Sequence, residues 1–183
     1  MRRRKRKEEK SRFRVFWGWI LFILILLLLL ILGVYLVGHR TVATGSGMRP
    51  TLEEGDVLLV DKVSDLFTDP GRFDVVVFPS RYEEDSLYVR RIIAKPGETV
   101  QIVNGKIYIN GNLLKENGSF GDVEKAGLAA EPMTLGEDEY FVLSDNRSDG
   151  SDSREPSIGF IRRDELEGRA RLVMWPLAHI RML

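Results

Sequence analysis

Few side chains in this chain could support nucleophilic or metal-dependent chemistry. The 183 residues include no cysteine, so thiolate nucleophiles, thiolate metal ligands and disulfides are excluded. The two imidazoles, His39 and His179, lie near opposite ends of the chain, which argues against a zinc site and against a histidine-based catalytic triad. Serine, lysine and carboxylate groups are left for chemistry, and we expect neither a metal nor a cofactor.

Three polar segments carry most of these groups. The segments are Gly45-Ser-Gly-Met-Arg-Pro-Thr-Leu-Glu-Glu-Gly-Asp56, Arg72-Phe-Asp-Val-Val-Val-Phe78 with Tyr88-Val-Arg-Arg-Ile-Ile-Ala-Lys-Pro-Gly-Glu98, and Ser144-Asp-Asn-Arg-Ser-Asp-Gly-Ser-Asp-Ser-Arg154. In order and spacing they resemble the type I signal peptidase family, membrane-anchored serine endopeptidases that remove signal peptides from exported proteins. The resemblance covers nearly the whole chain and implies a β-rich core of coiled antiparallel sheets.

The resemblance implies a Ser–Lys dyad, and this chain departs from it at three positions. In the family, a buried neutral lysine takes the proton of the serine nucleophile. The register of Met48 and Pro50 places the nucleophile position at Gly47, and the second segment places the general base at Arg90. The third segment normally supplies a serine that supports the lysine, and that position is Gly150. Glycine has no nucleophilic atom and arginine stays protonated, so the proton-transfer unit is lost.

Two displaced groups are the fallback nucleophile and base. Ser46 is one residue out of register, and in an extended segment its side chain would point to the opposite face. Lys95 lies five residues beyond Arg90, next to a proline. The residues that the resemblance assigns to bracing the site are retained: Arg91, Asp145, Asn146, Arg147, Asp152 and Arg154.

The charge pattern divides the chain into three parts. Residues 1–14 hold nine Lys/Arg and two acidic residues, residues 15–37 hold no charge, and the remainder holds 18 Lys/Arg and 25 acidic residues. The 23 uncharged residues would reach about 35 Å as a helix, enough to cross a bilayer. We therefore predict a single-pass anchor at 15–37, a cytoplasmic basic tail that attracts anionic lipid and not nucleic acid, and an extracytoplasmic domain at 38–183. A cleaved secretory signal is the alternative, but the apolar run is too long and no Ala-x-Ala site follows it.

After residue 38 the pattern predicts a mainly β domain. Asn104-Gly105 and Asn110-Gly111 are hairpin-turn signals. Residues 115–138 are rich in Gly and acids and are interpreted as a loop or excursion. One helical turn is expected at 162–167. The predicted strands are 56–60, 74–78, 87–94, 99–103, 106–110, 113–114, 139–143 and 169–175.

Three functional hypotheses follow from the resemblance. The first is a signal peptidase homologue without activity that holds exported proteins by strand addition along residues 42–47 and a neighbouring strand, as a chaperone-like factor near pilins and a sortase. The second is an active peptidase that uses Ser46 and Lys95. The third is an enzyme disabled deliberately at 47 and 90, against which Gly150 argues because it is a third change in the same unit.

Overall fold

The computed structural model describes residues 16–30, 38–64, 67–81, 86–116, 118 and 120–183. The chain divides into two compact units, Met1–Gly38 and His39–Leu183. Residues 16–30 of the first unit are helical. Across the described ranges, no helix is both long and apolar enough to cross a membrane. The predicted tail at 1–14 lies outside the described residues, and so do both ends of the predicted anchor at 15–37.

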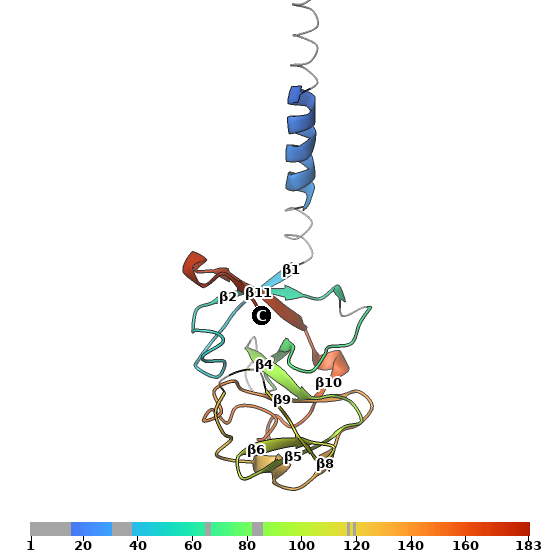
Figure 1. Cartoon of the computed structure of the whole chain (residues 1–183), viewed down its shortest axis with the longest axis vertical. Coiled ribbons are helices and arrows are strands. Elements are labelled where there is room, and N and C mark those ends of the chain that lie inside the picture. The colour runs from blue at the N-terminus through green and yellow to red at the C-terminus, as the bar shows by residue number, and fades with distance from the viewer. Residues whose placement is uncertain (1–15, 31–37, 65–66, 82–85, 117, 119) are drawn as a thin grey trace, which may run out of the picture. The chain divides into compact units, whose positions relative to one another are not determined.

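The second unit is mainly β and contains two sheets (Figure 1). The larger sheet has the strand order β1-β2-β11-β3-β4-β9-β10, with β12 paired to β11, and the smaller has the order β7-β6-β5-β8. Every pairing described from β2 onward is antiparallel. The strands of the larger sheet are β1 (Gly38–Val42), β2 (Val57–Asp61), β3 (Val75–Pro79), β4 (Leu87–Ala94), β9 (Glu139–Leu143), β10 (Ile161–Arg162), β11 (Gly168–Trp175) and β12 (Arg181–Met182). Those of the smaller sheet are β5 (Thr99–Val103), β6 (Lys106–Ile109), β7 (Asn112–Leu113) and β8 (Met133–Thr134).

The strand predictions are confirmed to within one residue at each end. Strands β4, β5 and β9 have the predicted bounds. Both Asn-Gly turns have positive φ at each residue, with Asn104 at +48° and Gly105 at +76°, and Asn110 at +51° and Gly111 at +78°. This is the twist that a two-residue hairpin needs, so local chemistry alone determined these turns.

Some local predictions are wrong or incomplete. Residues 115–138 are not only a loop, because they contain the 3₁₀ turn η2 (Gly127–Ala130) and strand β8, which pairs with β5. Val123, Ala129 and Leu135 from this stretch are buried in the core of the smaller sheet. The helical turn predicted at 162–167 is the shorter 3₁₀ turn η3 (Arg163–Glu165). Strands β1, β8, β10 and β12 and the turn η4 (Leu177–His179) were not predicted; three of these strands have only two residues, too few to show alternation.

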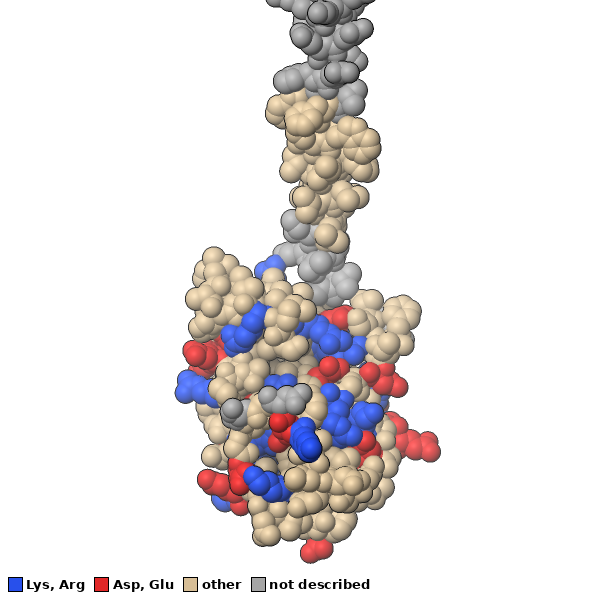
Figure 2. Space-filling model, viewed as in Figure 1, with Lys and Arg blue, Asp and Glu red and all other residues tan. Residues whose placement is uncertain are grey.

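Each face of the larger sheet covers a separate apolar cluster. Val75, Val77 and Val89 point to one side and pack with residues of β2 and β11. Val76, Phe78 and Ile92, from the alternate positions, pack with residues of β9 and β10. Because successive side chains of a strand point to opposite faces, strand β4 also presents Arg90 and Arg91 on different sides. On the face of the domain that Figure 2 shows, Lys and Arg side chains lie among Asp and Glu side chains.

Candidate active site

The first motif forms a tight turn after β1 and does not continue the strand. Gly45 has φ at +72°, a conformation that glycine adopts without strain. Residues 47–51 are in turns, and the Arg49 N–H donates to the Ser46 carbonyl at 3.2 Å. The expectation of an extended segment through residues 42–47 is therefore wrong, because β1 ends at Val42.

Buried side chains hold this turn in place. Met48 and Leu52 are 5% and 2% exposed and pack against the strand residues of the core. The Leu52 N–H donates to the Met48 carbonyl at 2.7 Å. Pro50 is exposed and follows a cis peptide bond. Met48 thus fixes the position of its neighbour Gly47, whose carbonyl accepts a hydrogen bond from the Asn146 N–H at 2.9 Å.

The structure places the Arg90 guanidinium beside Gly47, the two positions that the resemblance assigns to the dyad. A Cβ atom placed on Gly47 would lie 3.2 Å from Nη1 and 3.3 Å from Cζ of Arg90. The same atom would lie 3.0 Å from Oδ2 of Asp149. Ordinary carbon contacts are about 3.5–4.0 Å, so the guanidinium occupies space that the side chain of any other residue at 47 would need.

Main-chain carbonyls and an aromatic ring hold the Arg90 side chain. Its Nε donates to the Ser151 carbonyl at 2.6 Å, and its Nη1 donates to the Val89 carbonyl at 2.7 Å. Its Cζ lies 5.0 Å from the centroid of the Tyr88 ring, a cation–π distance. With only 6% of the residue exposed, position 90 carries a fixed, buried cation.

The protonation state of Arg90 excludes the role of a general base. Burial lowers the pKa of the guanidinium, while the negative charges of Asp149 and Asp152 act to raise it. A guanidinium has so high an ordinary pKa that it remains protonated in proteins despite such a shift.

Asp149, and not Gly150, contributes the side chain nearest to this pair. A Cβ on Gly150 would lie 3.1 Å from Oε1 of Glu155, and no Arg90 atom would be within 4 Å of it. Asp149 is oriented by the Ser151 N–H, which donates to its Oδ1 at 2.9 Å. We did not predict a role for Asp149 from the sequence; its place directly before Gly150 in the third motif was the available signal.

A buried ion pair joins strand β4 to the third motif. Nε and Nη2 of Arg91 donate to the two carboxylate oxygens of Asp145 at 2.7 and 2.6 Å. Arg91 Nη1 also donates to the Phe73 carbonyl at 2.8 Å. The Asp145 carboxylate is fully buried, and a bidentate pair of this kind fixes orientation as well as distance.

A second pair braces the third motif internally. Nε and Nη2 of Arg154 donate to the two oxygens of Asp152 at 2.8 and 2.7 Å. Asp152 Oδ2 also accepts from the Ser144 N–H at 2.9 Å, and Arg154 Nη1 donates to the Arg147 carbonyl at 2.9 Å. The two ends of the 144–154 loop are thereby tied together.

The 115–138 segment packs on this loop through one aromatic ring. The Phe120 ring centroid lies 5.1 Å from Cζ of Arg91 and 5.2 Å from Cζ of Arg147. Arg147 also forms an ion pair with Glu116. The excursion is thus a strap across the bracing arginines, a contact that the sequence did not predict.

The structure does not bring the fallback residues together. Ser46 is exposed in the turn, and its carbonyl accepts hydrogen bonds. Lys95 is exposed just beyond the end of β4, about 16 Å along the chain from Arg90 at strand spacing. Lys95 lines a separate open pocket with Asp69 and Arg163.

The C-terminus reaches back to the first motif. Nδ1 of His179 is hydrogen-bonded to Oδ1 of Asp56 at 2.8 Å, and Arg181 Nη2 lies 3.4 Å from Asp56 Oδ2. Asp56 is 1% exposed. Burial raises the pKa of this carboxyl, but hydrogen bonds from His179 and the Glu53 N–H, with the charges of His179 and Arg181, bring it below its ordinary value.

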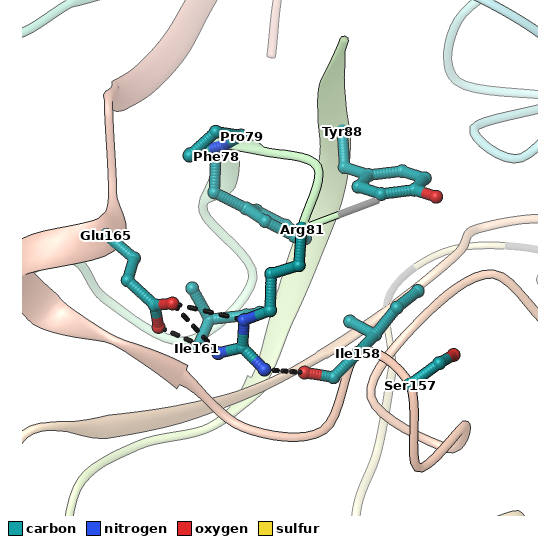
Figure 3. Close-up of a pocket in the computed structure, with 8 residues that line it drawn as sticks. All are labelled: Phe78, Pro79, Arg81, Tyr88, Ser157, Ile158, Ile161 and Glu165. Atoms are coloured by element: carbon teal, nitrogen blue, oxygen red, sulfur yellow. Dashed lines mark hydrogen bonds and ion pairs between the residues drawn. The ribbon is translucent and has the colours of Figure 1, made fainter. Parts of the chain in front are cut away.

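A small apolar recess lies on the sheet face that carries Tyr88 (Figure 3). The Phe78 and Tyr88 rings, with centroids 5.7 Å apart, form part of its wall. Arg81 lies across it, donating to the Glu165 carboxylate and to the Ile158 carbonyl. Within the described part of the chain, no group of three or more His, Cys, Asp or Glu is placed to hold a metal ion.

A family model described as signal peptidase, peptidase S26, matches residues 16–175. The chain belongs to this family. This signal peptidase homologue is 36% identical over 146 residues to "Probable signal peptidase I-2" of Synechocystis sp., 34% identical over 144 residues to signal peptidase I T of Bacillus subtilis, and 37% identical over 139 residues to signal peptidase I of Leptolyngbya laminosa. The matches cover 75%, 75% and 71% of this chain and 63%, 74% and 65% of those relatives.

A crystal structure of signal peptidase I from Enterococcus faecalis V583 also matches the homologue. The identity is 32%, the match covers 56% of this chain and 97% of that chain, and the TM-score is 0.46.

Proposed function

We propose that this signal peptidase homologue binds exported precursor proteins and does not cleave them. The main support for the proposal is that the Arg90 guanidinium lies beside Gly47. Acyl transfer by a Ser–Lys dyad needs a hydroxyl at one position and a neutral amine at the other. Glycine supplies no nucleophile, and a protonated guanidinium accepts no proton. Removing a nucleophile typically lowers the rate by roughly 10⁶.

The direct test is cleavage of a precursor protein by the full chain purified in detergent. We expect no product after an Ala-x-Ala site beyond the uncatalysed background. Clear turnover by the chain as it stands would overturn the proposal in favour of displaced catalytic groups. In that case the Ser46→Ala and Lys95→Met variants would show whether those two residues carry the activity.

The open edge of strand β4 supports a binding mode for an extended peptide. Strand β9 pairs with β4 only from Arg91 to Ala94, whereas β3 pairs with it from Leu87 to Arg91. Among the described strands, none pairs with Leu87–Arg90 on the side away from β3. Along the first motif, by contrast, the N–H and carbonyl of Ala43 are already bonded to Asp56 and Gly55. We therefore place strand addition on β4.

We expect photo-crosslinking in cells to trap exported proteins beside the first motif, where Gly47 lies next to the Arg90 side chain of strand β4. A photoreactive residue at exposed Thr44, beside the first motif, should capture precursor proteins, including pilins or sortase substrates where the cell makes them. Exposed Leu113, on the smaller sheet, is the matched control position. Equal capture from both positions would contradict a binding role for the region around the first motif.

We propose that residues 15–37 anchor the chain in the membrane, with the tail in the cytoplasm and the domain outside. The 23 uncharged residues and the nine basic residues before them support this topology. Because the chain has no cysteine, single introduced thiols report the topology cleanly. In intact cells, an impermeant maleimide should label Glu54→Cys and leave Ser11→Cys unlabelled; the reverse pattern would contradict the topology.

A further inference from the structure

Arg90 differs from the other buried arginines of the described residues because its side chain forms no ion pair with a carboxylate. Each of the others forms an ion pair with a carboxylate. Arg90 has no carboxylate oxygen within ion-pair distance among the described residues, and its described hydrogen bonds go to main-chain carbonyls. A buried cation is stable when an anion accompanies it, so this position lacks the partner that the fold provides elsewhere. The paired arginines are Arg91, Arg147, Arg154 and Arg169.

The Arg90 guanidinium also lies at one end of the open edge of strand β4. The N–H and carbonyl of Ile92 bond on the β3 side, to the Asp74 carbonyl and the Phe73 N–H. Main-chain groups alternate in direction along an antiparallel strand, so those of Leu87 and Val89 face away from β3, toward the open side. Arg90 Nη1 occupies the Val89 carbonyl at 2.7 Å. A peptide strand that pairs with this edge would therefore end beside the Arg90 guanidinium, at Val89.

Two main-chain N–H groups of the first motif, next to the Arg90 guanidinium, lack an acceptor in the described part of the chain. The N–H groups of Gly47 and Met48 have no hydrogen-bond acceptor among the described residues. Asp149 places a carboxylate oxygen 3.0 Å from the position of a Gly47 Cβ, close to the guanidinium but not in an ion pair with it. The position thus already accommodates one carboxylate, which would compete with any external one.

We infer that the ligand is a peptide whose free C-terminal carboxylate ends at Arg90, and not a continuous chain that passes along the β4 edge beyond Arg90. This inference rests on the proposed function and names its ligand class. The peptide pairs along Leu87–Val89 with the main-chain groups that Arg90 leaves free, and its carboxylate pairs with the guanidinium. Such a terminus arises when an endopeptidase adds water across the following peptide bond, so a separate peptidase must act first.

The test compares three fluorescent peptides binding to the full chain in detergent. One decapeptide ends Ala-Gln-Ala with a free carboxylate, the second has the same sequence with a C-terminal amide, and the third continues for ten residues past Ala-Gln-Ala. We expect the free acid to bind about tenfold more tightly than the other two, because it adds a charge-assisted pair. Arg90→Met should abolish this preference, so that the free acid and the amide bind with equal affinity. Asp149→Asn should increase the preference by removing the competing carboxylate.

The outcomes distinguish carboxylate recognition from the proposed function, which is peptide binding. Equal affinity for the acid, the amide and the longer peptide would overturn carboxylate recognition and leave peptide binding standing. Binding of none of the three would overturn the proposed function itself. If Arg90→Met does not fold, as judged by its melting transition, Asp149→Asn decides: an unchanged ratio of acid to amide affinity overturns the inference.

Discussion

At the scale of residues, the substitutions at 47 and 90 depend on one another. The Arg90 guanidinium lies 3.2 Å from the position of a Gly47 Cβ, so an arginine at 90 is compatible with glycine at 47 and crowds anything larger. The residue types at 47 and 90, which look independent in the sequence, are thus linked by the space that they share.

Gly47→Ser alone should destabilise the chain. The new Cβ would contact Arg90 and Asp149 at 3.0–3.3 Å, and overpacking of this kind costs about 1–3 kcal/mol. Thermal or urea unfolding measures the loss. Gly71→Ser is the matched control, since its Cβ would meet Asp74 only at 3.7 Å. Equal stability of the two variants would show that the guanidinium moves aside freely.

Peptidase activity should return only in the double variant Gly47→Ser/Arg90→Lys. Each single variant lacks half of the dyad, whereas the pair restores a hydroxyl and an amine and removes the forked guanidinium from beside position 47. Precursor cleavage is the assay. A folded double variant without activity would mean that the loss extends to other positions, and adding Gly150→Ser would test the third substituted position.

At the scale of elements, the strap at 115–138 is held to the site by a ring between two cations. Phe120→Leu removes both cation–π contacts, which together should cost about 1–2 kcal/mol of the free energy of unfolding. Limited proteolysis should then cut within 115–126 sooner than in the unmodified chain. Phe67→Leu, at a side chain that is 82% exposed, should change neither measurement. Unchanged proteolysis of the Phe120 variant would mean that the strap is held by its apolar core residues alone.

At the scale of the whole molecule, a hydrogen bond joins Asp56 to His179, which lies 123 positions further along the chain. The folded state holds the pKa of Asp56 below its ordinary value of 3.8, so the ionised form contributes stability above that pH. This contribution is lost as the pH falls through the lowered pKa of the folded state. Asp61, whose pKa is also lowered despite burial, adds to the same trend.

Unfolding measured between pH 7 and pH 3 should therefore show stability falling at the acid end. Asp56→Asn should be less stable at pH 7, by about 1–3 kcal/mol for a buried carboxylate that loses its charge-assisted partners, and should show a flatter acid dependence. Exposed Glu54→Gln is the neighbouring control. If Asp56→Asn and the unmodified chain lose stability identically with falling pH, Asp56 does not contribute to the acid dependence of unfolding.

The sequence alone determined most of the strands, because β-branched alternation and Asn-Gly turns act over a few residues. The proposed loss of the dyad also rests on the sequence, because glycine has no nucleophilic atom and arginine stays protonated in any fold. Only the tertiary structure decided that Arg90 fills the space beside Gly47, and that Asp149 and not Gly150 faces them. It also decided that Phe120 contacts the bracing arginines and that His179 bonds to Asp56 of the first motif. Each of these contacts joins residues far apart in the chain, and their distances depend on how the sheet brings the three motifs together.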